Sequence, residues 1–280
     1  MGFKKFAQLV WIEQTLFSLP FAYLGVLFAG GGTIVQWMWV TVAMAGARTA
    51  AMSFNRVIDA EIDGKNPRTS GRLVPRGEVK HRSVWLIAGV SLLVLVVAAY
   101  MLNPLCFYLS GAAVVLLFTY SYFKRFTSFS HFYLGVVEAA APIGGYLAIK
   151  GEFTLVPFLL GFIILMWMAG LDIVYSLQDL EIDKRDRLHS MPVSIGKGPA
   201  LVVSAGCYVL SVVGMVLAGI RVGMPVPYWF GVAGVGAIYT YQQILARSEN
   251  IASTIGRFLG ANAYVSITLF AGTAVAVVLR

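Results

Sequence analysis

Long apolar segments dominate this chain of 280 residues. Hydrophobic residues make up 59% of the sequence and charged residues only 12%, and the mean hydropathy is +0.79. A soluble domain could not bury so much apolar side-chain surface, because much of any folded surface faces water. The same composition excludes a disordered, collagen-like, coiled-coil or disulfide-rich secreted chain. We therefore predict an all-α, polytopic membrane protein.

Nine segments approach the length of about 20 apolar residues that a membrane-spanning helix needs. In chain order they are residues 11–29, 37–58, 83–102, 105–123, 131–149, 153–177, 199–220, 227–246 and 256–279. This pattern predicts a bundle of about nine transmembrane helices around a central cavity, with cytoplasmic loops as its cap. Eight or ten spans are the alternatives.

The placement of Lys and Arg predicts the orientation of the bundle. Of the 21 basic residues, 17 lie on one side of the predicted membrane, three lie on the other, and Arg48 lies within a span. The N-terminus and the two long loops 59–82 and 178–197 are therefore expected in the cytoplasm, and the C-terminus outside. This arrangement suits a prokaryotic-type inner or plasma membrane. It also accounts for the net charge of +8, so we expect no nucleic-acid partner, and no obligate protein partner is evident.

The cysteines and histidines indicate neither a disulfide framework nor a zinc site. Cys106 and Cys207 both lie within apolar segments. The three histidines, His81, His131 and His189, are scattered along the chain and are expected at the surface or at helix ends.

A short acidic motif occurs twice. The sequence Asp-x-Glu-Ile-Asp stands at residues 59–63 and again at 179–183, which is 120 residues later, and each copy follows the end of a predicted span. Such a repeat indicates an internal duplication in which two halves present matching edges to one cavity. We predict a single domain, 1–280, with two related halves that carry acidic motifs at 55–63 and 172–183.

The spacing within these motifs predicts a metal site. Residues four apart lie on one face of a helix, so the polar residues of each motif should point the same way. Grouped carboxylates repel one another unless a cation joins them, and Mg²⁺ is typically held by one or two carboxylates together with phosphate oxygens. The expected cofactor is Mg²⁺, with two ions bridging a diphosphate. The predicted ligands are Asn55, Asp59, Asp63, Asp179 and Asp183. The alternative is that these acids are solvated loop residues paired with nearby Arg and Lys.

Both motifs resemble those of the UbiA superfamily of intramembrane aromatic prenyltransferases. The similar residues are Asn55-x-x-x-Asp59-x-x-x-Asp63 and Asp172-x-x-Tyr175-x-x-x-Asp179-x-x-x-Asp183. Segments 15–20, 66–72 and 120–125 also resemble family segments, and the likeness covers essentially the whole chain. It is greatest to the 4-hydroxybenzoate polyprenyltransferases of quinone synthesis and their menaquinone-pathway relatives. Arg56 and the sequence Arg72-Leu-Val-Pro75 depart from the family pattern, but neither departure replaces a predicted metal ligand.

The resemblance implies Mg²⁺-dependent transfer of a polyprenyl group from its diphosphate to an aromatic ring, inside the lipid bilayer. The expected acceptor is 4-hydroxybenzoate or a related aromatic acid of ubiquinone or menaquinone biosynthesis. A naphthoate, haem or chlorophyll precursor is the alternative acceptor, and a secondary transporter is the alternative function. A CDP-alcohol phosphotransferase is disfavoured because its Asp-Gly-x-x-Ala-Arg signature is absent.

Basic side chains near the motifs are the predicted diphosphate ligands, because guanidinium and ammonium groups bind phosphate oxygens well. They are Arg68, Arg72, Lys124 and Arg125. Together with the metal, Asp59 and Asp179 would act directly on the leaving diphosphate.

The predicted acceptor site lies deeper in the membrane. Charges inside a membrane are costly and are usually functional, so Arg48 is expected to bind the acceptor's carboxylate or another polar group. Asp172 would accept the phenol proton or orient the ring, assisted by Tyr175. The alternative is that Arg48 and Asp172 pair with each other across the bundle. Glu138 either lines the cavity or makes a structural hydrogen bond.

Overall fold

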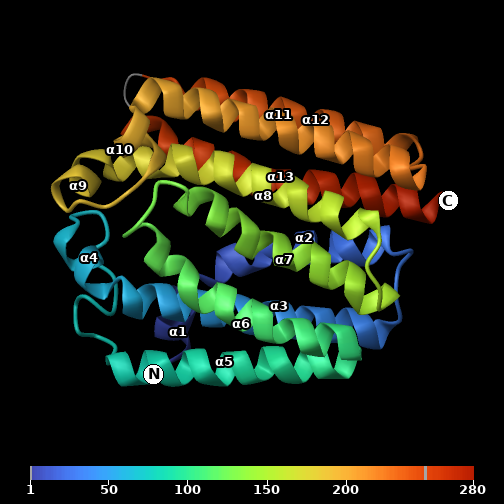
Figure 1. Ribbon diagram of the computed structural model, residues 1–280, viewed down its shortest axis with the longest axis horizontal. Helices are drawn as coiled ribbons and strands as arrows, with labels where there is room; N and C mark the ends of the chain where they lie inside the picture. Colours follow the sequence, from blue (N-terminus) through green and yellow to red (C-terminus); the bar gives the residue numbers. More distant parts are fainter. Residues whose placement is uncertain (1, 249–250) are drawn as a thin grey trace.

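The computed structural model describes residues 2–248 and 251–280, apart from the side chains of residues 13–17 and 252. All regular secondary structure in these residues is helical. Part of the family-like segment 15–20 therefore lies outside the described side chains. Figure 1 shows the long helices running side by side as a bundle.

The described residues include nine helices of 17 residues or more, and each overlaps one predicted span. They are α2 (Ile12–Phe28), α3 (Ile34–Ile58), α5 (His81–Leu102), α6 (Pro104–Phe123), α7 (Ser130–Lys150), α8 (Leu155–Ser176), α11 (Lys197–Val222), α12 (Val226–Ala246) and α13 (Ile251–Val278). Six helical segments of the described chain are long and apolar enough to cross a membrane, namely His81–Leu102, Pro104–Phe123, Ser130–Lys150, Leu155–Arg185, Lys197–Val222 and Ser253–Val278. They indicate an integral membrane protein, and the count of nine spans stays a prediction.

The short helix α1 (Phe3–Val10) precedes α2, and further short helices form the polar connections between the long ones. The latter are α4 (Ala60–Lys65), the 3₁₀ turn η1 (Leu177–Asp179), α9 (Leu180–Arg185) and α10 (Met191–Ile195). Helices α4, α9 and α10 gather at one end of the bundle, and the C-terminus lies at the opposite end (Figure 1). The two long charged loops predicted from the sequence therefore cover the same end.

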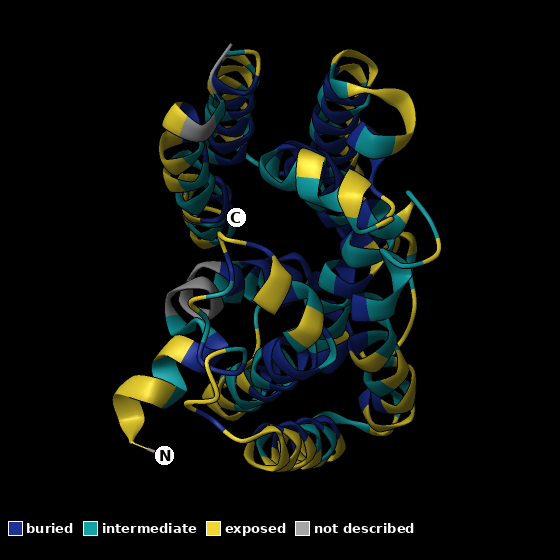
Figure 2. Cartoon of the chain, turned by 90° about the vertical axis from the view of Figure 1, so that its left-hand side faces the viewer, coloured by how far each residue is buried: buried dark blue, intermediate teal, exposed yellow. Residues whose placement is uncertain are grey.

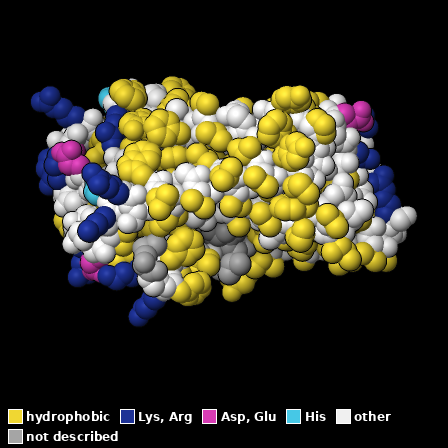
Figure 3. Space-filling view, turned by 90° about the horizontal axis from the view of Figure 1, so that it is seen from below, with side chains coloured by type: hydrophobic (Ala, Val, Ile, Leu, Met, Phe, Trp, Pro, Cys, Tyr) yellow, Lys and Arg dark blue, Asp and Glu magenta, His cyan; other side chains and the backbone are white. Residues whose placement is uncertain are grey.

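The surface between the two ends is apolar. Hydrophobic side chains cover the middle of the molecule, and Lys and Arg gather at its ends (Figure 3). Large apolar residues such as Leu86, Leu93 and Phe230 are exposed on the outer helix faces, whereas buried residues occupy the interior (Figure 2). This distribution is expected where lipid replaces water as the solvent of the outer face.

Small residues bring α2 and α7 into close contact. A Cβ atom built on Gly145 would lie only 2.0 Å from the carbonyl oxygen of Ala22, and one on Gly25 would lie 2.1 Å from that of Pro142. Only glycine permits the two backbones to approach this closely. The contact fixes the position of α7, which carries part of the candidate site.

The helices that carry the acidic motifs are interrupted at the same position in both halves. Asp59, directly after α3, has φ −93° and ψ 3°, and Asp179, at the end of η1, has φ −105° and ψ 6°. A separate six-residue helix follows each of them. The predicted spans end at residues 58 and 177, next to these interruptions. The helical spacing that was expected to place the polar residues of each motif on one face therefore spans a break in the helix, at Asp59 in one half and at Leu177–Asp179 in the other.

Candidate functional site

Asp59 is the most enclosed carboxylate of the first motif, with 1% of its surface exposed. Its Oδ2 atom accepts a hydrogen bond from the Asn55 side chain at 2.7 Å and lies 2.8 Å from the Lys124 ammonium nitrogen. A guanidinium nitrogen of Arg125 lies 3.6 Å from Oδ1. Burial raises the pKa of the Asp59 carboxyl above its usual value, and the charge of Lys124 opposes this shift.

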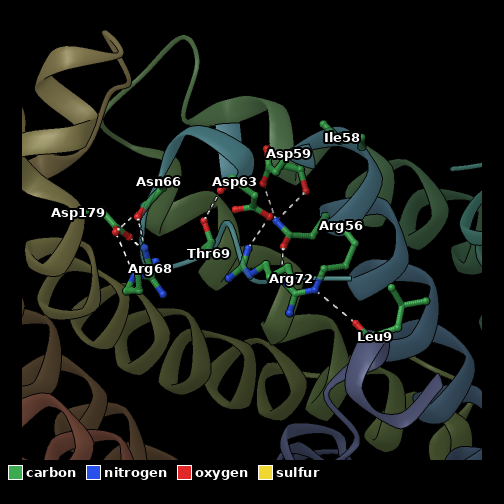
Figure 4. A network of polar contacts seen from close by, with 12 residues as sticks. Leu9, Arg56, Ile58, Asp59, Asp63, Asn66, Arg68, Thr69, Arg72 and Asp179 are labelled. Carbon is green, nitrogen blue, oxygen red and sulfur yellow. Dashed lines mark hydrogen bonds and ion pairs between the residues drawn. The ribbon is translucent and has the colours of Figure 1, made fainter. Parts of the chain in front are cut away.

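Asp63 faces the basic loop that follows α4. Arg72 forms an ion pair with its carboxylate at 2.6 Å, and the Thr69 hydroxyl donates to its backbone carbonyl at 3.0 Å. Arg56, which departs from the family pattern, donates to the Leu9 carbonyl at 3.3 Å and to the Asn55 side chain at 3.4 Å. Arg56 therefore connects α1 to the first motif (Figure 4).

The same basic loop reaches the second motif. The Asn66 side chain donates to Asp179 at 2.8 Å, and Arg68 binds both carboxylate oxygens of Asp179. Arg68 also donates to the Tyr175 hydroxyl at 2.8 Å, and its guanidinium carbon lies 5.1 Å from the centre of that ring. The basic loop therefore brings the two acidic motifs together along one edge of the bundle (Figure 4). This edge, called the rim below, is formed by Asp59, Asp63, Asn66, Arg68, Arg72 and Asp179. Asn66 was not predicted as a site residue, although it begins the family-like basic segment.

Asp183 lies on α9 and is half-buried. Its carboxylate makes no hydrogen bond or ion pair with the described side chains, while its backbone carbonyl accepts from the Leu188 amide at 2.8 Å. The amide of His189 donates to the Lys124 carbonyl at 2.7 Å, so the segment after α9 contacts the segment after α6. The predicted metal ligands and diphosphate ligands thus share one end of the bundle.

The aspartates of the two motifs offer oxygen donor atoms to a metal ion. No three His, Cys, Asp or Glu side chains within residues 2–248 and 251–280 form a preformed metal cluster. The Asp59 Oδ1 atom is nevertheless buried and accepts no hydrogen bond in the described structure. Buried oxygens normally have a partner, and Mg²⁺ needs only one or two carboxylates when phosphate supplies the rest. The donor set therefore fits Mg²⁺, with Asp59, Asp63, Asp179 and Asp183 as candidates.

Asp172 pairs with a histidine. Its Oδ2 atom lies 2.6 Å from Nδ1 of His131, and Nε2 of His131 accepts a hydrogen bond from the Met191 amide at 3.0 Å. Because Nε2 is the acceptor, Nδ1 carries the proton and donates it to Asp172. His131 stands at the start of α7, as expected for a helix-end residue, but it is buried rather than on the surface, with 2% exposed. Its pairing with Asp172 was not predicted.

Arg48 pairs with Glu138 at 2.5 Å, and both side chains line a cavity of about 390 Å³. The alternative that Arg48 pairs with Asp172 is therefore wrong, because each has a different partner on α7. The central cavity was expected between the two halves. The cavity found is lined by α2, α3, α5 and α6 on one side and by α7 together with Phe153 on the other. The offset of 120 residues between the two motifs makes α7 the counterpart of α2, so residues of both halves line this cavity.

The chain is similar to known proteins along nearly its whole length. The sequence profile of the UbiA prenyltransferase family matches residues 18–278. A 4-hydroxybenzoate octaprenyltransferase of Cupriavidus necator is 26% identical over 98% of both chains.

The apo structure of a UbiA homolog from Aeropyrum pernix is 29% identical, with a TM-score of 0.87 over 94% of this chain and 98% of that one. A UbiA homolog from Archaeoglobus fulgidus, bound to GPP and Mg²⁺, has the same fold at 17% identity, with a TM-score of 0.68 over 96% and 99% of the two chains. The chain therefore belongs to the UbiA prenyltransferase family.

Proposed function

We propose that this protein transfers a polyprenyl group from polyprenyl diphosphate to a hydroxylated aromatic acceptor of quinone biosynthesis, in a Mg²⁺-dependent reaction. The names of the relatives support 4-hydroxybenzoate or a related aromatic acid as the acceptor. The observation that carries the proposal is the rim at which Asn66 and Arg68 join the first half to Asp179. A diphosphate placed there meets carboxylates and cations from both motifs.

The residues of the rim have complementary tasks. Arg68, Arg72, Lys124 and Arg125 each lie against a motif aspartate, so their charges are also available to the oxygens of a bound diphosphate. Asn55, Asp59, Asp63, Asp179 and Asp183 would hold Mg²⁺. When bound by these side chains, Mg²⁺ would supply positive charge to the diphosphate as the leaving group.

The acceptor is held deeper in the bundle. Arg48 stands seven residues before Asn55 on α3, which is about 10 Å along the helix axis. Its cationic head binds a polar group of the acceptor, and the apolar walls of the cavity exclude water from the reactive carbon. Asp172, oriented by His131, takes up the proton released from the phenol, and Tyr175 helps to orient the ring.

The proposed orientation follows the distribution of charge. The rim faces the cytoplasm in a prokaryotic-type inner or plasma membrane, with the N-terminus on the same side and the C-terminus outside. Support comes from the position of the C-terminus at the end of the bundle opposite α4 and α9 (Figure 1).

Prenyl transfer by purified Asp59→Ala and Asp179→Ala proteins tests the proposal. We expect each variant to lose about a hundredfold or more of the Mg²⁺-dependent rate, because each loses charge stabilisation of the leaving group. The assay combines one labelled prenyl diphosphate with a panel of hydroxylated aromatic acceptors, and the product mass identifies the acceptor.

Asp186→Ala is the matched control, because Asp186 pairs with Arg185 at 2.9 Å outside both motifs. It should keep the rate of the unmodified protein. Full Mg²⁺-dependent transfer by both motif variants would contradict the proposed role of the aspartates. No transfer to any acceptor by the unmodified protein would contradict the proposed reaction.

A further inference from the structure

The short helix α1 has an apolar face that packs on the protein along only part of its length. Its last two residues, Leu9 and Val10, are buried, whereas Phe3 in its first turn is 77% exposed. Phe3, Phe6 and Val10 follow one another at intervals of three and four residues, so they lie on one face of the helix. The apolar face of α1 therefore continues beyond the protein towards the N-terminus, where Figure 2 shows exposed residues.

Helix α1 lies at the border of the apolar surface that faces lipid. Leu9 and Val10 pack in one cluster with Val84, in the first turn of α5. The next two residues of α5, Trp85 and Leu86, are large, apolar and exposed. The lipid-facing surface thus begins at the level of α1, and tryptophan is enriched at the level of the lipid head groups.

Cationic side chains surround this part of the molecule. The Lys5 ammonium nitrogen lies 3.2 Å from a carboxylate oxygen of Glu78, and Arg76 lies 3.1 Å from the other. Within the described residues, Glu78 is the carboxylate that pairs with this group. The exposed cations on α1 and in the turn that packs against it, together called the α1 patch, are Lys4, Lys5, Arg76, Lys80 and Arg82. One carboxylate leaves most of their charge without a countercharge.

An acidic phospholipid matches both features of the α1 patch. A basic amphipathic helix with aromatic residues on its apolar face binds in the plane of the membrane interface, and acidic lipids strengthen this binding. The head-group phosphate would pair with the lysines while the acyl chains cover Phe3. A free anion would leave Phe3 in water, so the combination of charge and apolar surface favours a lipid.

The buried end of α1 also contacts the loop that carries cations of the candidate site. This basic loop, residues 66–80, contributes three buried residues to the cluster around Leu9, namely Leu73, Val74 and Val79. On the other side, Arg56 donates to the Leu9 carbonyl at 3.3 Å and to the Asn55 side chain at 3.4 Å. A fixed position of α1 therefore restricts both the basic loop and the start of the first motif.

We propose that α1 is an interfacial anchor that binds acidic phospholipid head groups through Lys4 and Lys5 and thereby holds the basic loop in place. The proposal concerns the bilayer around the protein, so it is independent of the reaction and of the acceptor.

Lipid selectivity in nanodiscs tests the proposal. A fluorophore is attached at Gln8→Cys, an exposed position of α1, and the native cysteines Cys106 and Cys207 are buried. Spin-labelled phosphatidylglycerol and spin-labelled phosphatidylcholine are compared as quenchers at equal mole fractions. We expect phosphatidylglycerol to be enriched about fivefold or more at α1, because each lysine near an acidic surface contributes about that factor to binding. Added salt should reduce the enrichment.

Two double variants separate the α1 patch from the general charge of the protein. Lys4→Gln with Lys5→Gln should lose most of the enrichment. Lys150→Gln with Arg221→Gln is the matched control, because these exposed cations lie at the ends of α7 and α11 away from α1. The control should retain the enrichment of the unmodified protein.

Hydrogen exchange measures the effect on the basic loop. Backbone amides of residues 66–80 should exchange more slowly in nanodiscs with phosphatidylglycerol than in phosphatidylcholine alone, and Lys4→Gln with Lys5→Gln should abolish the difference. Equal quenching by the two lipids, or an unchanged ratio in the lysine variant, would overturn the anchor. Enrichment of phosphatidylglycerol with no change in loop exchange would overturn its effect on the loop.

Discussion

At the scale of single residues, the site is built from carboxylates held by specific donors. Asp59 is held by Asn55 and Lys124, and Asp179 by Asn66 and Arg68. Hydrogen bonds to charged groups are stronger and more directional than those between neutral groups. The positions of these carboxylates are therefore fixed by side chains as well as by the helices that carry them.

Asp172 offers the clearest test of this arrangement. His131 donates to Asp172 and accepts from the Met191 amide, so it fixes the carboxylate of α8 relative to α7 and α10. We expect His131→Asn to lower kcat for prenyl transfer by about tenfold or more, because a hydrogen bond to a charged group contributes about 1.5–3 kcal/mol. The KM for the prenyl diphosphate should change less than kcat, because the hydrogen bonds of the His131 ring go to Asp172 and the Met191 amide and not to Asn66 or Arg68.

The exposed residue His189 supplies the matched control. Steady-state kinetics of His189→Asn should match those of the unmodified protein. An unchanged kcat in His131→Asn, or a defect confined to the KM for the diphosphate, would show that Asp172 does not need its histidine.

At the scale of helices, close backbone contacts hold the cavity together. Gly145 on α7 meets Ala22 on α2, and a methyl group on Gly145 would overlap the Ala22 carbonyl oxygen. We expect Gly145→Ala to lower the free energy of unfolding by about 1–3 kcal/mol, the usual cost of overpacking. Gly144→Ala is the matched control, because no atom lies within 4 Å of the Cβ position there. Thermal unfolding in detergent measures both, and equal stability of the two variants would contradict the role of this contact.

The sequence predicted the helices better than their interruptions. All nine predicted spans overlap long helices in the described residues, because apolar length is a strong signal. The ends of the long helices α3 and α8 lie at or next to the predicted span ends 58 and 177, but the short helices α4 and α9 that follow were not predicted. The four-residue spacing of Asn55, Asp59 and Asp63 also fits an uninterrupted helix. No local sequence feature separates the two possibilities.

The partners of the buried charges depend on how helices pack in space. The sequence indicated that Arg48 and Asp172 lie deep in the bundle, but each has a partner on α7, Glu138 for one and His131 for the other. Which helix faces which is set by tertiary contacts such as that of Gly145 with Ala22. Asn66 was not predicted as a site residue because its role depends on tertiary packing. Its partner Asp179 lies 113 residues away in sequence.

At the scale of the whole molecule, the two halves of this prenyltransferase are joined by polar contacts at one end. Asn66 and Arg68 of the first half bind Asp179 and Tyr175 of the second. Like charges of the four motif aspartates oppose this junction, and the surrounding Arg and Lys offset the repulsion. A ligand that binds residues of both halves should therefore stabilise the fold as a unit.

Mg²⁺ with inorganic diphosphate is such a ligand, because it presents cations to the aspartates and anionic oxygens to the basic residues. Binding to the folded state alone adds about 2.7 kcal/mol of stability at a free ligand concentration about 100 times Kd. We expect Mg²⁺ and diphosphate together to raise the Tm by several degrees, and each alone to raise it less. Asp59→Asn should reduce the combined shift, since it removes charge at the first motif, whereas Asp186→Asn should leave it unchanged. An equal rise in Tm for the unmodified protein, Asp59→Asn and Asp186→Asn would show that the diphosphate binds away from the rim. It would also contradict a shared role of the two motifs in binding it.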